Sequence, residues 1–381
     1  MPAIAGMLCL CLGAGLIGVY GFFVKPLSDE FGVGAAVINI GPAALLLVPG
    51  IVSPFVGRLA DRMPVRRMVL IGATVAMASL YLISRVSELY LAALLFMVFS
   101  FGLTFYGPVV VNGLMVRQYP GREARAVAVA AIGISVASVI LAPLMGFLLS
   151  TFTWREALAW LAAGVWCLLM LVSFCCLPAG TGGAAASQER AGAAIVRRRE
   201  FWLIGLGVAM GMSVTVVLAI IYPPHFVSQG YSLEQAGWFL ALAGFSGFLG
   251  KTGVAWVGDA GRPYARWLAA ALLALQLGGL ALLLQAQSAQ GVAFAMVLLG
   301  SGAGAFLPMH PFLNSRYFGA DVISQVIGSQ MPLFLPFGLI GAPLAGYVFD
   351  QSGSYEPAMI GLAVMLVGAI GLLLALPAAD D

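Results

Sequence analysis

The sequence predicts an all-α membrane protein with twelve transmembrane helices arranged as two six-helix pseudo-repeats. Of its 381 residues, 62% are hydrophobic and only 9% are charged, whereas soluble domains carry about 25% charged residues. Apolar stretches follow one another along the whole chain, and most reach the roughly 20 residues that a membrane helix needs. Several short motifs recur in the same order in the two halves of the chain. These observations exclude a soluble enzyme and a disordered chain.

Charged and turn-rich breaks divide the chain into the twelve expected spans. Their approximate bounds are residues 4–27, 35–57, 68–85, 89–115, 124–150, 156–177, 201–227, 234–257, 265–285, 290–315, 322–349 and 356–377. Transmembrane strands are not expected, because the runs are too long and do not alternate. No basic segment precedes the first span, so we expect a retained helix and not a signal peptide.

The distribution of Lys and Arg predicts the orientation, because basic residues concentrate in cytoplasmic loops. Fourteen of the 18 basic residues lie in or beside loops that follow even-numbered spans: Arg58, Arg62, Arg66, Arg67, Arg117, Arg122, Arg125, Arg190, Arg197, Arg198, Arg199, Arg262, Arg266 and Arg316. The opposite side holds Lys25, Arg85 and Arg155, and Lys251 lies inside the eighth span. We therefore expect both termini in the cytoplasm. The expected location is the inner membrane of the cell.

Several function classes are excluded by composition and spacing. A net charge of +3 spread along the chain gives no basic patch for nucleic acid. The two His and five Cys do not form a metal-ligand spacing, and the cysteines lie in apolar runs, which favours free thiols. Gly250-Lys251-Thr252 lacks the earlier glycine of an ATP-binding loop. We therefore expect no metal, no cofactor and no enzymatic activity.

The longest polar segment separates six spans from six and predicts an N-terminal bundle (1–178), a cytoplasmic linker (179–199) and a C-terminal bundle (200–381). The halves resemble each other at an offset near 200 residues. The pentapeptide at 142–146 recurs in modified form at 342–346, and Pro108 corresponds to Pro308. Parallel six-helix repeats place a substrate path between the halves near the bilayer midplane, with rocking as the motion.

The segment after the second expected span carries a recognisable loop motif. It reads Gly57-Arg58-Leu59-Ala60-Asp61-Arg62-Met63-Pro64-Val65-Arg66-Arg67 and resembles the Gly-x-Leu-x-Asp-Arg-x-Gly-Arg-Arg loop of the major facilitator superfamily. Pro64 replaces the usual Gly, and Val65 adds one residue. A weaker echo surrounds Asp259. The resemblance implies a gating loop formed by Gly57, Asp61, Arg62, Arg66 and Arg67, with Asp259 as its counterpart. A carboxylate there can bind a neighbouring helix N-terminus and pair with Arg.

A second resemblance concerns the branch of the superfamily. The segment Tyr20–Gly32 looks like the end of span 1 in bacterial monocarboxylate-transporter-like and oxalate/formate-antiporter-like proteins, and Arg125 with Ala128 fits the start of span 5. This branch implies transport of small organic carboxylates, with a proton or by exchange. One feature departs from it: animal monocarboxylate transporters carry an acidic residue four positions before the basic residue of span 8, whereas position 247 here is Gly.

Lys251 is the clearest candidate for binding substrate, because a charge within the bilayer is costly and marks a functional site by default. It lies about 12 Å deeper than Asp259 at 1.5 Å per residue, among glycines that leave room for a ligand. The alternative is that its long stem snorkels to the cytoplasmic surface. The same two interpretations apply to Lys25 at the end of the first span: it attracts anions at the outer mouth, or its side chain snorkels to the outer surface.

Two histidines are candidates for proton coupling, because imidazole titrates near neutral pH. His310 lies between two prolines, and His225 follows Tyr222-Pro223-Pro224. The alternative for each is a packing or hydrogen-bonding role. The superfamily resemblance implies that spans 1, 4, 7 and 10 line the cavity. It therefore favours Tyr20, Tyr106, Asn112 and Tyr222 as lining residues, against simple interhelical hydrogen bonds worth about 1 kcal/mol.

No Asp or Glu lies deep in any expected span, while Lys251 does, and this favours an anionic substrate. We expect a monomeric secondary active transporter of a small organic anion, and a monocarboxylate is the favoured substrate. Its expected partners are protons, as candidate co-substrates, and the surrounding lipid bilayer. The first alternative is an exporter of hydrophobic or weakly acidic drug-like compounds. The second is a non-transporting receptor or scaffold.

Overall fold

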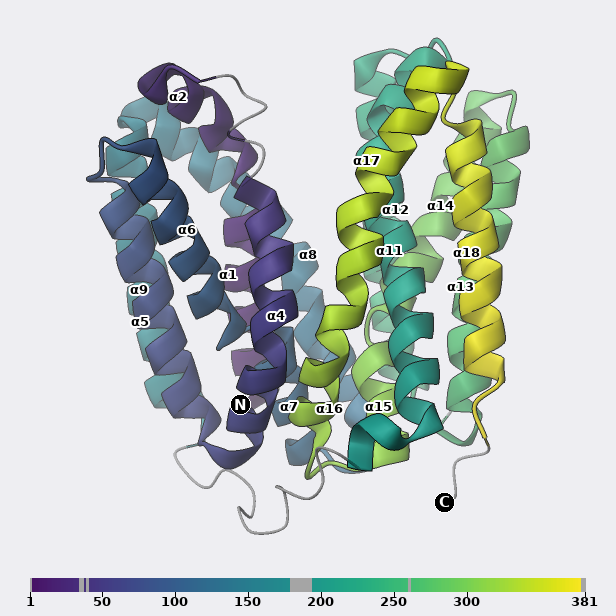
Figure 1. Ribbon diagram of the computed structural model, residues 1–381, viewed down its shortest axis with the longest axis horizontal. Helices are drawn as coiled ribbons and strands as arrows, with labels where there is room; N and C mark the ends of the chain where they lie inside the picture. Colours follow the sequence, from purple (N-terminus) through teal and green to yellow (C-terminus); the bar gives the residue numbers. More distant parts are fainter. Residues whose placement is uncertain (1, 34–37, 39–40, 179–193, 260–261, 378–381) are drawn as a thin grey trace. The chain divides into compact units, whose positions relative to one another are not determined.

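The computed structural model describes residues 2–33, 38, 41–178, 194–259 and 262–377, and all regular structure in them is helical (Figure 1). The first half of the chain contains α1 (Pro2–Gly18), α2 (Gly21–Phe31), α4 (Gly41–Arg62), α5 (Val65–Ile83), α6 (Leu89–Thr104), α7 (Pro108–Gln118), α8 (Glu123–Thr151) and α9 (Trp154–Cys176). The second half contains α11 (Arg199–Ser228), α12 (Leu233–Val257), η1 (Arg262–Tyr264), α13 (Ala265–Gln285), α14 (Ala289–Phe306), α15 (Met309–Phe318), α16 (Ile323–Gln330), η2 (Met331–Phe334), α17 (Leu335–Ser352) and α18 (Glu356–Leu374).

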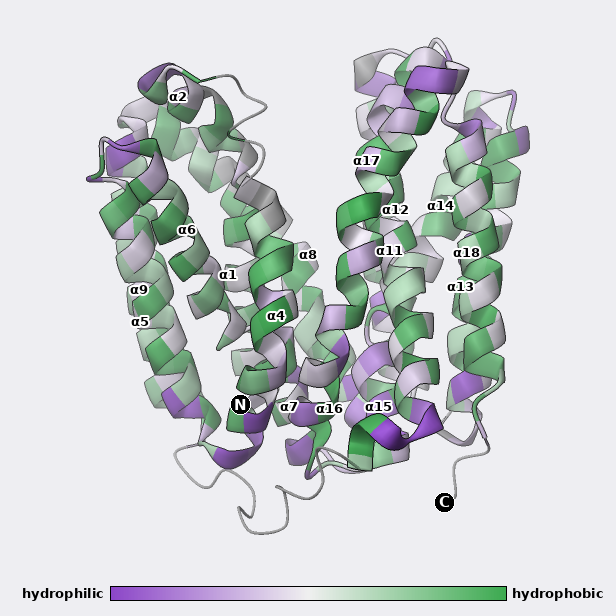
Figure 2. Ribbon diagram, in the orientation of Figure 1, coloured by the Kyte–Doolittle hydropathy of each residue, from purple (hydrophilic) through white to green (hydrophobic). Residues whose placement is uncertain are grey.

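The described helices have the length and composition of membrane spans. Nine helical segments are long and apolar enough to cross a bilayer, or ten if the bent pair α1 and α2 forms one span. Two further predicted spans, 124–150 and 234–257, coincide with α8 and α12. Figure 2 shows hydrophobic residues along the middle of the helices and hydrophilic residues near their ends. The chain is thus a multi-pass helical membrane protein, as predicted, and the count of twelve stays a prediction.

Proline and glycine break some expected spans into two helices. The predicted span 89–115 is interrupted between α6 and α7, where Pro108 occupies the first helical position of α7. Proline fits this position because the first N–H groups of a helix have no intrahelical acceptor. The span 290–315 is also divided, between α14 and α15 at Leu307 and Pro308, and here the proline is the N-cap residue of α15.

The chain folds into two compact units, which are described separately. Unit 1 contains Met1–Pro120, Val129–Glu189 and Ala320–Ser329, and unit 2 contains Gly121–Ala128, Arg190–Gly319 and Gln330–Asp381. The start of α8 thus belongs to unit 2 and most of α16 to unit 1. The predicted division into 1–178, 179–199 and 200–381 stays a prediction, and most of its linker lies outside the described residues.

Small residues allow close helix packing in unit 2. A Cβ added to Gly304 of α14 would overlap the backbone of Gly247 in α12, and one added to Gly300 would overlap the backbone of Ala243. Such small-residue contacts let membrane helices approach closely, because lipid provides no hydrophobic drive for association. This contact fixes the part of α12 that carries Lys251.

We expect Gly304→Ala to destabilise the protein by about 1–3 kcal/mol, because the added methyl group meets backbone that cannot rotate away. The measurement is the thermal unfolding midpoint of purified protein in detergent. Gly278→Ala is the matched control, since a Cβ at this exposed position of α13 meets no atom within 4 Å. Equal midpoints for the two variants would contradict the close packing of α12 on α14.

Candidate functional site

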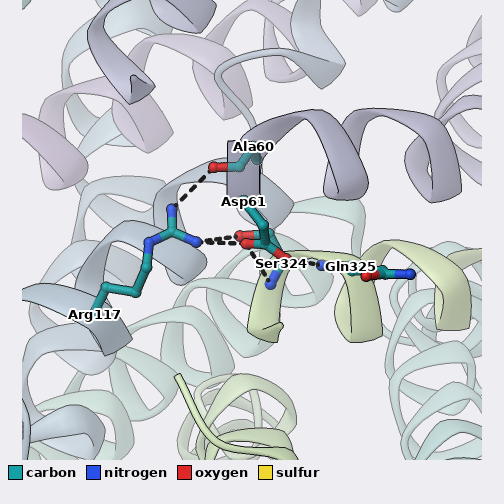
Figure 3. A network of polar contacts seen from close by, with 5 residues as sticks. All are labelled: Ala60, Asp61, Arg117, Ser324 and Gln325. Atoms are coloured by element: carbon teal, nitrogen blue, oxygen red, sulfur yellow. Dashed lines mark hydrogen bonds and ion pairs between the residues drawn. The ribbon is translucent and has the colours of Figure 1, made fainter. Parts of the chain in front are cut away.

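Asp61 is the centre of a buried polar network in unit 1 (Figure 3). It is the penultimate residue of α4, and only 1% of it is exposed. Arg117, in the last turn of α7, forms an ion pair with it at 2.5 Å between Nη1 and Oδ1. The same guanidinium donates to the Ala60 carbonyl at 3.3 Å and to Ser324 Oγ at 3.1 Å. Charge-assisted bonds of this kind are the strong ones in proteins.

The carboxylate of Asp61 also caps the N-terminus of α16. The backbone N–H groups of Ser324 and Gln325 donate to Oδ1 and Oδ2 at 3.3 Å and 2.8 Å. These first-turn groups have no acceptor inside their own helix, and the positive end of the helix dipole favours an anion. The Asp61 carboxylate therefore pairs with an arginine and also accepts hydrogen bonds from the N–H groups of a helix terminus.

Glycine makes this contact possible. A Cβ on Gly57 would overlap the carbonyl oxygen of Ser324, and a Cβ on Gly328 would overlap that of Ser53. The glycine of the loop motif is therefore needed for α4 to approach α16, four residues before the capping aspartate.

Asp259 makes an equivalent cap in unit 2. It follows α12 by two residues, and its Oδ1 accepts from the N–H of Ala124 at 2.9 Å, in the first turn of α8. The N–H of Arg125 donates to both carboxylate oxygens at 3.3–3.4 Å. Burial raises the pKa of the Asp259 carboxyl above its ordinary value, and the two N–H groups oppose this shift. The resemblance of the two loops thus extends to the helix terminus that each carboxylate binds.

Among the basic residues of the predicted gating loop, two are exposed and one lies over an aromatic ring. Arg62 and Arg67 are exposed, and the guanidinium of Arg66 lies 4.5 Å from the centre of the Phe174 ring. The arginine that pairs with Asp61 is Arg117, which the sequence analysis treated only as a topology signal. The sequence offered one clue, because Arg117 ends the fourth span on the same predicted side as the motif.

Lys251 is 8% exposed and lies six residues before the end of α12. The exposed face of this helix carries Phe245 (61%), Leu249 (50%) and Trp256 (87%). At about 100° per residue, Lys251 points roughly 160° away from Leu249 on the helical wheel. Neighbouring Gly250 is also in close contact, since a Cβ there would lie 2.5 Å from the Ser301 carbonyl. The lysine therefore lies on the inward face of its helix.

His310 belongs to a buried network in unit 2 with Asn314 and Gln330. The ring Nε2 of His310 and the amide Nδ2 of Asn314 each lie 2.7 Å from Gln330 Oε1. Gln330 Nε2 donates to the Phe201 carbonyl at 2.9 Å, so its oxygen must face the histidine. Nε2 of His310 is therefore the protonated nitrogen, and the ring connects α15 to the end of α16.

His225 and Tyr222 lie one turn apart on α11, within an aromatic cluster of unit 2. The Tyr222 ring stacks on Phe226 at 5.8 Å, and the His225 ring lies 6.5 Å from that of Tyr355. Both candidates are buried, and Nδ1 of His225 has no hydrogen-bond partner in the part of the chain that the structure describes.

The remaining candidates lie in unit 1. Tyr106 is fully buried, and its ring is close to Gly13 and Gly72. Tyr20 donates to the Ile38 carbonyl at 2.5 Å, and Asn112 is half-buried on α7. The Lys25 side chain lies outside the described residues. Because these residues and Lys251 belong to different units, a shared substrate cavity stays a prediction.

A bundle of apolar helices with carboxylate-capped termini at two related loops is typical of a membrane transporter. Residues 6–335 match the sequence pattern of the Major Facilitator Superfamily, and the chain belongs to this family. The predicted superfamily and its all-helical fold are therefore confirmed, and members of this family are transporters and not enzymes.

Two curated relatives cover nearly the whole chain. Monocarboxylate transporter 11 of Homo sapiens is 28% identical and aligns with 96% of this chain and 81% of its own length. Monocarboxylate transporter 13 of Rattus norvegicus is 24% identical, with coverages of 95% and 85%.

Solved structures agree with the fold. The fucose:proton symporter FucP of E. coli gives a TM-score of 0.77 at 14% identity, covering 97% of both chains. The human organic anion transporter MFSD10 gives a TM-score of 0.73 at 15% identity, covering 98% of both chains. At these identities the structures establish the fold alone.

We expect Asp61→Asn to destabilise the protein by about 3 kcal/mol, because it leaves the guanidinium of Arg117 without its carboxylate. Ser324→Ala removes one hydrogen bond and should cost less, about 1 kcal/mol. Thermal unfolding midpoints in detergent measure both effects. A double-mutant cycle combines Asp61→Asn with Arg117→Gln. The double variant should lose less stability than the sum of the two single variants, by about 1 kcal/mol or more. Additive costs would show that the ion pair contributes nothing.

Proposed function

We propose that the protein is a secondary active transporter of a small organic anion, with a monocarboxylate as the expected substrate. It works by alternating access between the halves 1–178 and 200–381, in an inner membrane with both termini in the cytoplasm, and acts as a monomer. The observation that carries the proposal is the buried lysine on the inward face of α12. The relatives named as monocarboxylate transporters support the substrate class.

The charges of the described helices favour an anion. Their acidic residues all lie within about one turn of a helix end: Asp29, Glu30, Asp61, Glu123, Glu156, Glu200, Glu234, Asp350 and Glu356. The most buried of these, Asp61, already binds Arg117 and the α16 terminus. Lys251 lies deeper in its helix than any of them. An ammonium at this depth can pair with a carboxylate at low dielectric, whereas a cation would find no equivalent carboxylate.

The loop caps support the proposed motion. Asp61 and Asp259 each bind a helix N-terminus through a few hydrogen bonds. Bonds of this number can break and re-form at a cost of a few kcal/mol. A change of state is then an equilibrium between capped and uncapped helix termini, which substrate binding shifts by its differential affinity.

The two histidines differ in their suitability for carrying a proton. His310 is held by Gln330 and Asn314, which gives it a structural role in unit 2. Nδ1 of His225 is buried and has no hydrogen-bond partner among the described residues, and it lies next to the ring of Tyr355 and near the acidic Glu356 that begins α18. We infer that His225 is the better candidate for proton coupling.

The proposed function is tested by counterflow in liposomes that contain the purified protein. We expect a preloaded short-chain monocarboxylate to accelerate entry of the labelled compound. Sugars, amines and apolar drugs should have no such effect. Drug efflux without carboxylate exchange would establish the competing exporter function. If no solute is transported or shifts thermal stability, a non-transporting role becomes the better description.

We expect Lys251→Gln to weaken carboxylate binding about tenfold, which corresponds to about 1.4 kcal/mol, because the charge partner of the substrate is lost. The readout is the concentration dependence of counterflow. Thr252→Val is the matched control, since the Thr252 hydroxyl donates only to its own helix at the Leu249 carbonyl. Unchanged affinity in Lys251→Gln would refute the anchor assignment, whatever the substrate class proves to be.

We expect an inward proton gradient to drive carboxylate uptake by the wild type. His225→Gln should abolish this drive and preserve counterflow, because exchange needs no net proton movement. His310→Gln serves as the comparison and should lower thermal stability through loss of the Gln330 hydrogen bond. If the proton gradient still drives carboxylate uptake by the His225→Gln variant, His225 is not the coupling residue.

A further inference from the structure

A surface groove of about 550 Å³ lies in unit 1 between the end of α5 and the start of α9. Its polar end is lined by Ser84, Arg85 and Arg155. Its apolar end is lined by Tyr81, Trp160 and Ala163. The transport function assigns no role to this groove.

The two arginines differ in what they bind. Nη1 of Arg155 donates to the carbonyls of Ser84 and Val86 at 3.0 Å and 2.8 Å, and its Nη2 pairs with Glu30 at 2.8 Å. It therefore connects α9 to the end of α5. The Arg85 guanidinium lies 5.2 Å from the centre of the Tyr81 ring and donates to the Tyr81 hydroxyl at 3.1 Å. Within the described residues it forms no ion pair.

The acidic residues at the groove are already engaged. Glu156 accepts from the backbone N–H and the hydroxyl of Thr153 at 3.1 Å and 2.8 Å, as the capping box that begins α9. Glu30 is bound to Arg155. Arg85 lines the groove, and the nearby carboxylate of Glu156 is already held by the capping box that begins α9.

The groove lies beside exposed apolar side chains of α5 and α9, a kind of surface that lipid covers in a membrane protein. Trp160 is 61% exposed and Leu82 48% exposed, and Leu168 and Leu171 continue the apolar surface along α9. Tyr and Trp at the end of a span are typical of the boundary between hydrocarbon and headgroups. Arg85 follows the end of α5 by two residues, so we expect it at headgroup depth, with the apolar residues Tyr81, Trp160 and Ala163 of the groove beside it.

We propose that this groove binds one phospholipid molecule, with its phosphodiester on the Arg85 guanidinium and one acyl chain along Tyr81, Trp160 and Ala163. Guanidinium suits phosphate because its planar fork can donate two parallel hydrogen bonds. The bound lipid would cover the junction of α5 and α9 and fill a space that no described side chain occupies.

The test titrates delipidated protein in detergent with dioctanoyl phosphatidylglycerol and counts bound lipid by native mass spectrometry. Two controls test the parts of the lipid separately: dioctanoylglycerol has the acyl chains without phosphate, and inorganic phosphate has no acyl chains. We expect tight binding of the phospholipid alone, and about a tenfold loss of apparent affinity in Arg85→Gln. Ala163→Trp should reduce binding by filling the apolar end. Arg58→Gln, at an exposed arginine of α4 outside the groove, should bind as the wild type does.

Wild-type affinity in Arg85→Gln would overturn the proposal, and so would inorganic phosphate binding as tightly as the lipid. The thermal unfolding midpoint without lipid shows that each variant is folded. Arg85→Gln should keep the wild-type midpoint, because it loses one exposed hydrogen bond, so it carries the test even if Ala163→Trp does not fold.

Discussion

The binding of helix N-termini by carboxylates is the interaction on which the proposed transport cycle depends. Where a helix terminus is buried, no water replaces a lost hydrogen bond, so its first N–H groups need a partner within the protein. Asp61 supplies that partner for α16, and Asp259 supplies it for α8. In both cases the capped residues and the aspartate belong to the same compact unit, while the chain of the capped helix continues into the other unit. Each carboxylate thus caps a helix terminus of its own unit, close to the point where the chain of that helix passes from one unit to the other.

The proposed binding element and the capped helix termini differ in how firmly they are held. Lys251 lies on a helix whose contact with α14 is made by backbone against backbone at Gly247 and Gly304, and such a contact has little freedom to slide. The capped termini are different, because each depends on a few hydrogen bonds that can exchange partners. In the proposed transporter, a rigid α12 and exchangeable helix termini favour movement of a whole bundle over deformation within one bundle.

The sequence predicted the all-helical membrane architecture well, because apolar runs of this length depend on the bilayer and not on tertiary detail. It also identified Asp61 and Asp259 through a loop motif. It could not identify Arg117, Ser324 or Gln325, which contact Asp61 across 56 to 264 positions of sequence. The hydrogen bonds from His310 and Asn314 to Gln330 were missed although the residues are only 20 and 16 positions apart, because they join two different helices. The breaks at Pro108 and Pro308 show that continuous hydropathy does not reveal where a helix is divided.

The cap on α16 has an evolutionary consequence. Asp61 binds backbone N–H groups of Ser324 and Gln325, and every residue except proline carries such a group. The side chains in that first turn are therefore free to drift among related proteins without loss of these two bonds. The constraint falls instead on Gly57 and Gly328, where any side chain would separate the two helices. A search for covarying side-chain pairs would overlook this contact, whereas two invariant glycines far apart in the chain would reveal it.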